Sequence, residues 1–290
     1  MLPKRQILAS RISNARSRNN ERQLERALQR YFKALEKQVQ RNLKFYWQDN
    51  NLMMGQVDLI TEPILASHDE YYEILSKYIV REYQLGTQEA ERLIRQLNRN
   101  RVANKATKPK PRAFLKRTFE LFGIHATAEE DLLTRVFIAS ERTLARVDRS
   151  IMDIITLGYK SGNGINSVAN ELTRRFDQLT TWESKRIART EIHNAHNRGT
   201  MDKYQEFGVE YTMWIAADDE RTRESHLEIN GEIIRLGDTY SNGLKYPGDT
   251  DGPIEEWINC RCSNAPYVIP YGYAAPPMEQ FTENDLIKIR

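Results

Sequence analysis

The sequence predicts an α+β protein, in which an N-terminal helical bundle and long helices precede a small antiparallel sheet in a C-terminal domain. Three observations carry this prediction. Apolar residues recur every three or four positions through most of residues 20–207, which is the period of an amphipathic helix. From residue 209 the period changes to two, as in strands. A hydrophobic fraction of 40% and a charged fraction of 29% over 290 residues describe a soluble globular chain with a sizeable core.

The N-terminal part contains three predicted helices. The first covers residues 20–48, where six apolar residues are three or four positions apart: Leu24, Leu28, Tyr31, Leu35, Val39 and Leu43. A break follows at residues 49–55. The second helix is expected over residues 64–83 and to end at Gly86, because glycine favours helix C-termini. Thr87 is a suitable N-cap for a third helix that reaches residue 98.

The second half begins with a long periodic stretch over residues 128–157 and a short helix over 165–176. A further helix is expected to start at Thr180 or Thr181 and to stop at Gly208. Strands are predicted at residues 209–214, 232–236 and 265–269. The Asn230-Gly231 dipeptide is typical of a two-residue hairpin turn.

This succession predicts four regions. Residues 1–99 form a helical N-terminal region, and residues 100–117 form a basic linker whose Pro109 and Pro111 prevent a helix. Residues 118–270 form a domain of helices followed by a small sheet. Residues 271–290 form an extended tail that we expect to lie on a neighbouring protein.

The net charge of +3 conceals a strong polarity along the chain. Residues 92–117 carry ten Lys and Arg and no acid, whereas residues 218–256 carry eleven acids and four bases. A basic, extended segment binds DNA phosphates without sequence preference, although it could equally be solvated. The DNA-binding residues predicted in the linker are Arg99, Arg101, Lys105, Lys108, Lys110 and Arg112.

Membrane and secretion signals are not expected from this sequence. It contains no apolar run of about 18 residues, and the basic N-terminus lacks the apolar core of a secretory signal. Two cysteines separated by one residue do not make a disulfide framework, so we expect synthesis in a reducing cytosol.

Cys260 and Cys262 are candidate metal ligands, because residues i and i+2 of a strand point to the same side. Thiolates and imidazoles together bind zinc, and His226 is the natural third ligand. The fourth ligand would be His193, His196 or Asp218. The alternative is that the two thiols pack in the core as small apolar groups.

Charged residues near these cysteines predict a polar network. Arg189 is expected to pair with Asp218, and Glu191 with Arg221 or Arg223. Such a network fixes a helix against a sheet when its charges are paired. The same residue types in a cleft would instead bind phosphate or perform acid–base chemistry, so both alternatives stay open.

The order of these motifs resembles the C-terminal domain of the phage Mu F-like minor head proteins, the phage head morphogenesis protein family. The likeness covers about a quarter of the chain. It consists of Arg189, Thr190, Glu191, Trp214, Asp218, Arg221, Arg223, His226, Gly231, Pro247, Gly248, Asp249, Asn259, Cys260, Arg261 and Cys262.

The resemblance implies a minor capsid protein of a tailed bacteriophage, made in the host cytoplasm and retained in the virion interior. Its implied partners are the portal protein, a major capsid or scaffolding protein, and double-stranded DNA, with roles in head morphogenesis and in DNA packaging or ejection. The apolar stripe between Leu24 and Leu43 is the expected portal-docking surface, and the segment after Pro270 is the alternative.

An enzymatic role is the competing hypothesis. A metal-dependent nuclease or transferase would use His226, Asp218, Glu191 and the cysteines. The sequence contains no glycine-rich phosphate loop, no His-Glu-x-x-His and no Gly-x-Ser-x-Gly, so we expect no enzyme activity.

Overall fold

The computed structural model describes residues 4–48, 52–53, 55–103, 128–217 and 219–289. The chain divides into two compact units. We call Glu21–Tyr78 together with Glu129–Ala188 the helical unit. We call Met1–Asn20, Ile79–Ala128 and Arg189–Arg290 the mixed unit, because it contains helices and strands. Predicted domain boundaries at residues 99, 117 and 270 follow the sequence, whereas these units are formed by segments that are distant along the chain.

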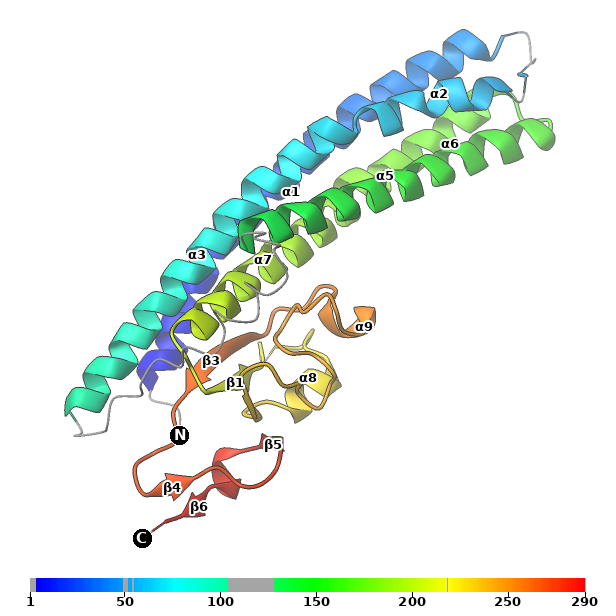
Figure 1. Ribbon diagram of the computed structural model, residues 1–290. Coiled ribbons are helices and arrows are strands. Elements are labelled where there is room, and N and C mark those ends of the chain that lie inside the picture. The colour runs from blue at the N-terminus through cyan, green and yellow to red at the C-terminus, as the bar shows by residue number, and fades with distance from the viewer. Residues whose placement is uncertain (1–3, 49–51, 54, 104–127, 218, 290) are drawn as a thin grey trace, which may run out of the picture. The chain divides into compact units, whose positions relative to one another are not determined.

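The long helices are visible in Figure 1. Helix α1 covers Lys4–Tyr46, α2 Gly55–Ala66, α3 His68–Ala103, α5 Ala128–Lys160, α6 Ile165–Gln178 and α7 Ser184–Glu206. Within the helical unit, α1, α2, α5 and α6 run side by side (Figure 1). Helices α1, α3 and α7 contribute residues to both units.

The predicted apolar stripe of α1 forms the core of the helical unit. Leu24, Leu28, Val39 and Leu43 are fully buried, and the rings of Tyr31 and Phe32 pack against Tyr71 of α3. Burial of each such side chain stabilises the fold by roughly 1.5–3 kcal/mol. The periodicity of this stripe is therefore explained by the bundle itself.

A π-helical turn, η1 (Leu179–Glu183), joins α6 to α7 without a break. The predicted helix start at Thr180 or Thr181 is therefore wrong. Neither hydroxyl caps a helix, because both donate hydrogen bonds to the backbone oxygen of Asp177 in the preceding turn. Backbone angles at Gln178 and Ser184 are right-handed helical, which carries the helix through the turn.

Gly86 does not end a helix, which corrects a second prediction. Helix α3 continues through it to Ala103, and Thr87 bonds back to Gln84 within the helix instead of capping a new one. A Cβ on Gly86 would lie 2.1 Å from the backbone oxygen of His196 in α7. The glycine therefore serves close packing of two helices in the mixed unit.

The sheet confirms the three predicted strands and adds a fourth. Strands β1 (Tyr211–Ile215), β2 (Ile233–Arg235), β3 (Ser263–Tyr267) and β5 (Gln280–Phe281) lie in the order β3-β1-β2-β5, and all neighbours are antiparallel. Alternation along β1 sends Tyr211 and Met213 to one apolar cluster and Trp214 to the other. Together with the helices this confirms the α+β class.

The connection from β1 to β2 is longer than a two-residue turn. It contains helix α8 (Glu224–Glu228), so the predicted Asn230-Gly231 hairpin is wrong. Asn230 instead accepts a hydrogen bond from the backbone N–H of Ala216 at 3.0 Å, and Gly231 has a φ of 89°. Only the second residue of the dipeptide takes the left-handed conformation.

The segment after Pro270 forms strand pairs inside the mixed unit. Strand β5 extends the sheet along β2, and β4 (Tyr273–Ala274) pairs with β6 (Ile287–Lys288). The sequence predicts an extended tail here, whereas in the structure parts of this segment pair as strands within the mixed unit. Polar residues of this segment form hydrogen bonds in short local turns, such as the capped turn η2 (Glu283–Asp285).

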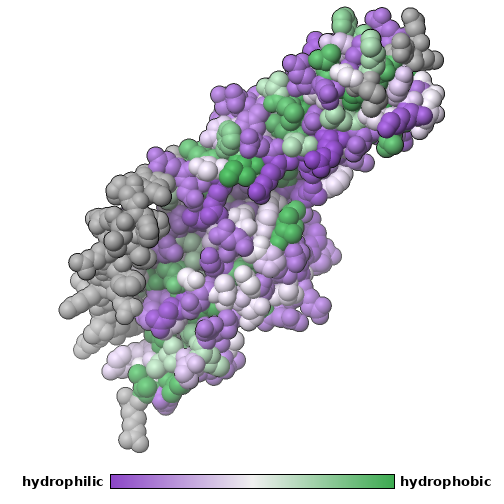
Figure 2. Space-filling view, turned by 45° about the vertical axis from the view of Figure 1, so that its right-hand side comes forward, coloured by the Kyte–Doolittle hydropathy of each residue, from purple (hydrophilic) through white to green (hydrophobic). Residues whose placement is uncertain are grey.

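Hydrophilic residues cover most of the face that Figure 2 shows, and hydrophobic residues form small separate groups there. None of the described helices has both the length and the apolarity that crossing a bilayer requires. Of the predicted DNA-binding residues, Arg99 and Arg101 belong to α3. Lys105, Lys108, Lys110 and Arg112 lie outside the described residues.

Candidate metal centre

Three predicted metal ligands converge in the mixed unit. His226 comes from α8, while Cys260 and Cys262 precede β3. Their ligand atoms lie within 4.8 Å of one another, and all three residues are buried. His226 Nδ1 is 3.3 Å from the sulfur of Cys262 and 3.7 Å from that of Cys260. This group can hold a metal ion.

The predicted orientation of the two cysteines is confirmed. Both thiols are buried on the side of His226, whereas Arg261 between them points to the surface and pairs with Asp219. This alternation is that of extended backbone. The segment arrives there through Asn259, whose φ of 56° is left-handed and whose N–H donates to the Thr190 hydroxyl of α7 at 3.1 Å.

His226 is held from both sides of its ring. Its Nε2 lies 2.9 Å from a carboxylate oxygen of Glu256, a residue of helix α9 (Ile254–Trp257). The ring of Trp214 in β1 packs edge-on against it, with 5.1 Å between ring centroids. Contacts with α9 and with the sheet thus fix the ring plane, and Nδ1 is the nitrogen that faces the sulfurs.

The two thiols share a proton unequally. The hydrogen bond between them raises the pKa of Cys260 well above the usual thiol value, and burial adds to the shift. The same hydrogen bond lowers the pKa of Cys262 to about 5, against the effect of burial and with help from a hydrogen bond to His226. The lowered pKa of Cys262 favours its thiolate, which is the form that binds metals.

Neither His193 nor His196, the two histidines predicted as a possible fourth ligand, belongs to this group of three among the described residues. His193 Nε2 accepts a hydrogen bond from Asn197 at 2.9 Å, and burial lowers the pKa of His193 to about 3. His196 lies between Glu82 and Glu89 instead, with its Nδ1 2.9 Å from Glu82. The third candidate, Asp218, lies outside the described residues.

Other residues of the motif shape the backbone around the centre. The amide of Asn197 donates to the backbone oxygens of Pro247 and Cys262, at 2.8 and 3.4 Å. Gly248 has a left-handed φ of 88°, which favours glycine, and a Cβ there would lie 2.5 Å from the side chain of Asn194. Asp249 is buried, and its carboxylate accepts hydrogen bonds from the backbone N–H groups of Lys245 and Asp251.

Of the predicted ion pairs of the motif, that of Arg189 with Asp218 involves a residue outside the described ones, and those of Glu191 are not found among the described residues. Arg223 donates to the backbone oxygen of Ile258 at 2.6 Å, and in the described part of the chain no ion pair joins Glu191 to Arg221 or Arg223. Burial raises the pKa of Glu191 to about 7. Arg261 takes Asp219 as its partner, beside the undescribed Asp218 that was expected to pair with Arg189.

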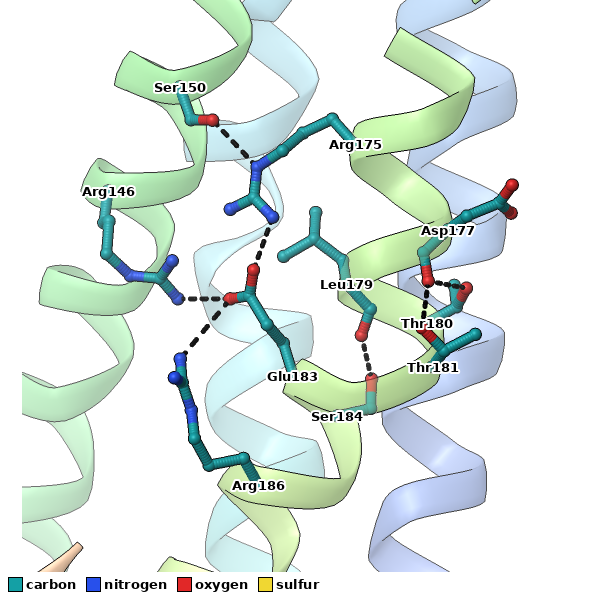
Figure 3. A network of polar contacts seen from close by, with 10 residues as sticks. All are labelled: Arg146, Ser150, Arg175, Asp177, Leu179, Thr180, Thr181, Glu183, Ser184 and Arg186. Carbon is teal, nitrogen blue, oxygen red and sulfur yellow. Dashed lines mark hydrogen bonds and ion pairs between the residues drawn. The ribbon is translucent and has the colours of Figure 1, made fainter. Parts of the chain in front are cut away.

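Sequence reasoning missed two polar groups. One is Glu256, whose contact with His226 joins residues 30 positions apart. The other is Glu183 of η1 in the helical unit, which Figure 3 shows surrounded by Arg146, Arg175 and Arg186. Glu183 is buried, while Arg146 is about half exposed. An acid between regularly spaced arginines was its only sequence signal, and it is a weak one.

Comparisons with known proteins point to the same part of the chain. Residues 149–265 match the family model of phage Mu protein F like protein. Minor head protein GP7 of Bacillus phage SPP1 is 29% identical over 129 residues, which are 42% of each chain. An uncharacterized protein of Haemophilus influenzae is 32% identical over 126 residues, or 42% of this chain and 25% of that protein.

The chain thus spans less than half the length of each of these relatives. No solved structure matches it. The matched residues include the whole candidate metal centre, the helix α7 that supports it, and Glu183 with Arg175 and Arg186, whereas Arg146 precedes them. Residues 149–265 are therefore similar to the phage Mu protein F like family.

Proposed function

We propose that this protein is a minor head protein of a tailed bacteriophage that acts in head morphogenesis. The observation that carries the proposal is the family match over residues 149–265, together with the similarity to a protein named as a minor head protein. Its place is the virion interior, after synthesis in the host cytoplasm. The motif residues support this role as structural elements, because they fix backbone turns and one buried cluster.

DNA contact is the second part of the proposal. The ten bases of residues 92–117, a stretch that contains no acid, support sequence-independent binding to packaged double-stranded DNA, since each neutralised phosphate releases counterions. The acidic part between Asp218 and Glu256 would be repelled by DNA. This polarity favours one DNA-facing segment and one protein-facing part, as packaging or ejection of a genome requires.

The portal protein is the proposed partner, with a major capsid or scaffolding protein as a further contact. Leu24 to Leu43 of the α1 stripe are buried in the bundle, so we propose a different docking surface. Large apolar side chains are exposed near the end of α1 and along α2 instead, and such residues favour protein contacts. They are Phe45, Met53, Leu59 and Leu65.

Zinc is the metal that we propose for the centre. Two thiolates and one imidazole are the donors that zinc prefers, whereas magnesium and calcium require oxygen ligands. The ion would have a structural role and fasten α8 to the segment before β3. Metal analysis of the purified chain tests this assignment, and we expect about one zinc per protein.

A nuclease or transferase is less well supported. Glu191 is not a member of the three-ligand group, and the side chains of that group are almost completely buried. A DNA cleavage assay with and without a chelator separates the two roles. Metal-dependent cleavage that is lost in Cys260→Ser would favour the enzyme.

The test of the head-protein role is co-expression with portal, capsid and scaffolding proteins from the same phage. We expect the full chain to co-purify with assembled heads. The double variant Phe45→Glu, Leu65→Glu should reduce its incorporation, whereas Tyr271→Glu tests the segment after Pro270. Failure of the full chain to associate with any head component would remove the proposal.

A further inference from the structure

We propose that Glu256 is the positioning carboxylate of the metal centre: it accepts a hydrogen bond from the Nε2–H of His226 and thereby presents an unprotonated Nδ1 to an ion held by Cys260 and Cys262. This inference rests on the proposed zinc site and adds a residue that lies outside its three ligands. Its consequence is that the chain specifies which nitrogen binds the metal.

The geometry of the ring carries the argument. A neutral imidazole has one protonated and one unprotonated nitrogen, and only the unprotonated nitrogen can bind a metal. Nδ1 faces both sulfurs, at 3.3 and 3.7 Å, so it is the nitrogen inside the ligand group. Nε2 lies 2.9 Å from a carboxylate, which can only accept a hydrogen bond. When a metal at Nδ1 replaces the hydrogen bond to Cys262, the proton therefore belongs on Nε2.

The carboxylate is itself held in place. The hydroxyl of Ser225, the residue before His226, donates to both oxygens of Glu256 at 3.0 and 3.3 Å. The guanidinium of Arg223, at the start of α8, donates to the backbone oxygen of Ile258 just beyond α9. With the His226–Glu256 bond, four hydrogen bonds thus join α8 and its N-cap to α9 and the residue after it, and together they restrict the rotation of the imidazole.

Burial makes this arrangement specific to His226. The side chain of His226 is 1% exposed, and that of Glu256 is 18% exposed. Because water has little access to Nε2, removal of Glu256 would leave a buried N–H donor without its acceptor. Carboxylates that hold a metal-binding histidine in this way typically strengthen metal affinity by about 10- to 100-fold.

The first experiment measures zinc affinity by competition with a chromophoric chelator. Glu256→Ala should weaken binding about 10- to 100-fold. Glu256→Gln should weaken it less, because the amide keeps an acceptor oxygen but loses the charge. Glu255→Ala is the matched control from the same helix, is exposed, and should bind zinc as the wild type does. Cys260→Ser should abolish binding.

The second experiment reads the tautomer directly. In zinc-loaded protein with 15N-labelled histidine, the nitrogen shifts of His226 should show metal at Nδ1 and a proton at Nε2. A general loss of stability would not change this signature, so it isolates positioning from folding. We expect the Nε2 proton to exchange faster in Glu256→Ala.

The outcomes separate this inference from the proposals beneath it. Zinc at Nε2, or equal affinity in wild type and Glu256→Ala, would overturn the role of Glu256 while leaving the zinc site intact. A wild-type protein that binds no zinc would overturn both. Neither result depends on incorporation into phage heads, which tests the head-protein role by itself.

Discussion

Gly86 of α3 lies directly against the backbone of His196 in α7, because a Cβ at residue 86 would be 2.1 Å from the His196 carbonyl oxygen. The contact is reciprocal, since a Cβ at Gly199 would be 2.2 Å from the backbone oxygen of Tyr83. Two glycines thus allow two helices of the mixed unit to touch. The same close approach brings His196 to the buried Glu82, at 2.9 Å.

We predict that Gly86→Ala destabilises the protein although alanine is the better helix former. Overpacking against the α7 backbone should cost about 1–3 kcal/mol, which exceeds the gain of about 1 kcal/mol in helix propensity. Thermal unfolding of the variant measures the effect. Gly55→Ala is the control, because nothing lies within 4 Å of its added Cβ. A Gly86→Ala protein as stable as wild type would contradict the close contact.

Glu183 should stabilise the helical unit in a pH-dependent way. Burial alone would raise its pKa, but hydrogen bonds and charges from Arg175 and Arg146 outweigh burial and lower the pKa below 4.5. A lowered folded-state pKa gives stability that is complete above 4.5 and is lost as pH falls through the folded value. Glu183→Gln should therefore cost about 3 kcal/mol at pH 7.

The difference between wild type and Glu183→Gln should shrink in acid, as chemical denaturation at several pH values would reveal. The control is Glu171→Gln, which removes an exposed pair with Arg174 and should change stability by less than about 1 kcal/mol. An equal cost at pH 3 and pH 7 would show that the charge of Glu183 is not what matters.

Glu191 should have the opposite effect. Burial raises its pKa to about 7, so the folded state binds a proton that the unfolded state releases above about 4.5. Stability from this group is thus full in acid and is lost as pH rises through 7. Glu191→Gln should match the wild type at pH 4 and exceed it at pH 8, by at most about 3 kcal/mol. Glu206→Gln, exposed on the same helix, is the control.

The predicted DNA-binding residues are testable by charge removal. Glutamine at all six positions of the basic segment should abolish most DNA binding and flatten its salt dependence, because each lost phosphate contact lowers the slope by about 0.9. Fluorescence anisotropy with a duplex at several salt concentrations measures both. The six substituted residues are Arg99, Arg101, Lys105, Lys108, Lys110 and Arg112.

A charge-matched control distinguishes this segment from a general effect of net charge. It replaces six exposed bases of the helical unit by glutamine: Lys33, Lys37, Arg41, Lys44, Arg142 and Arg149. We expect this variant to keep most of the affinity. Equal losses in the two variants would mean that the protein binds DNA through net charge and that the segment has no special role.

The spacing of apolar residues along the sequence determined most of the secondary structure. The stripe from Leu24 to Leu43 became a buried face, and the alternation around Trp214 became a strand with two apolar faces. The sequence also determined that Cys260 and Cys262 share a side, because that follows from backbone geometry alone. Backbone geometry does not by itself place His226 beside them. The structure confirms the prediction that this histidine, distant along the chain, lies next to both cysteines.

Tertiary packing decided what local rules could not. Gly86 looked like a helix end because glycine disfavours helices by about 1 kcal/mol, yet the contact with α7 outweighs that preference. Thr180 looked like a cap, but its place in η1 is set by the helix that continues through it. Glu256 carried no signal at all. Its role depends on α9 lying beside α8, and only the folded chain brings a carboxylate to the outer nitrogen of His226.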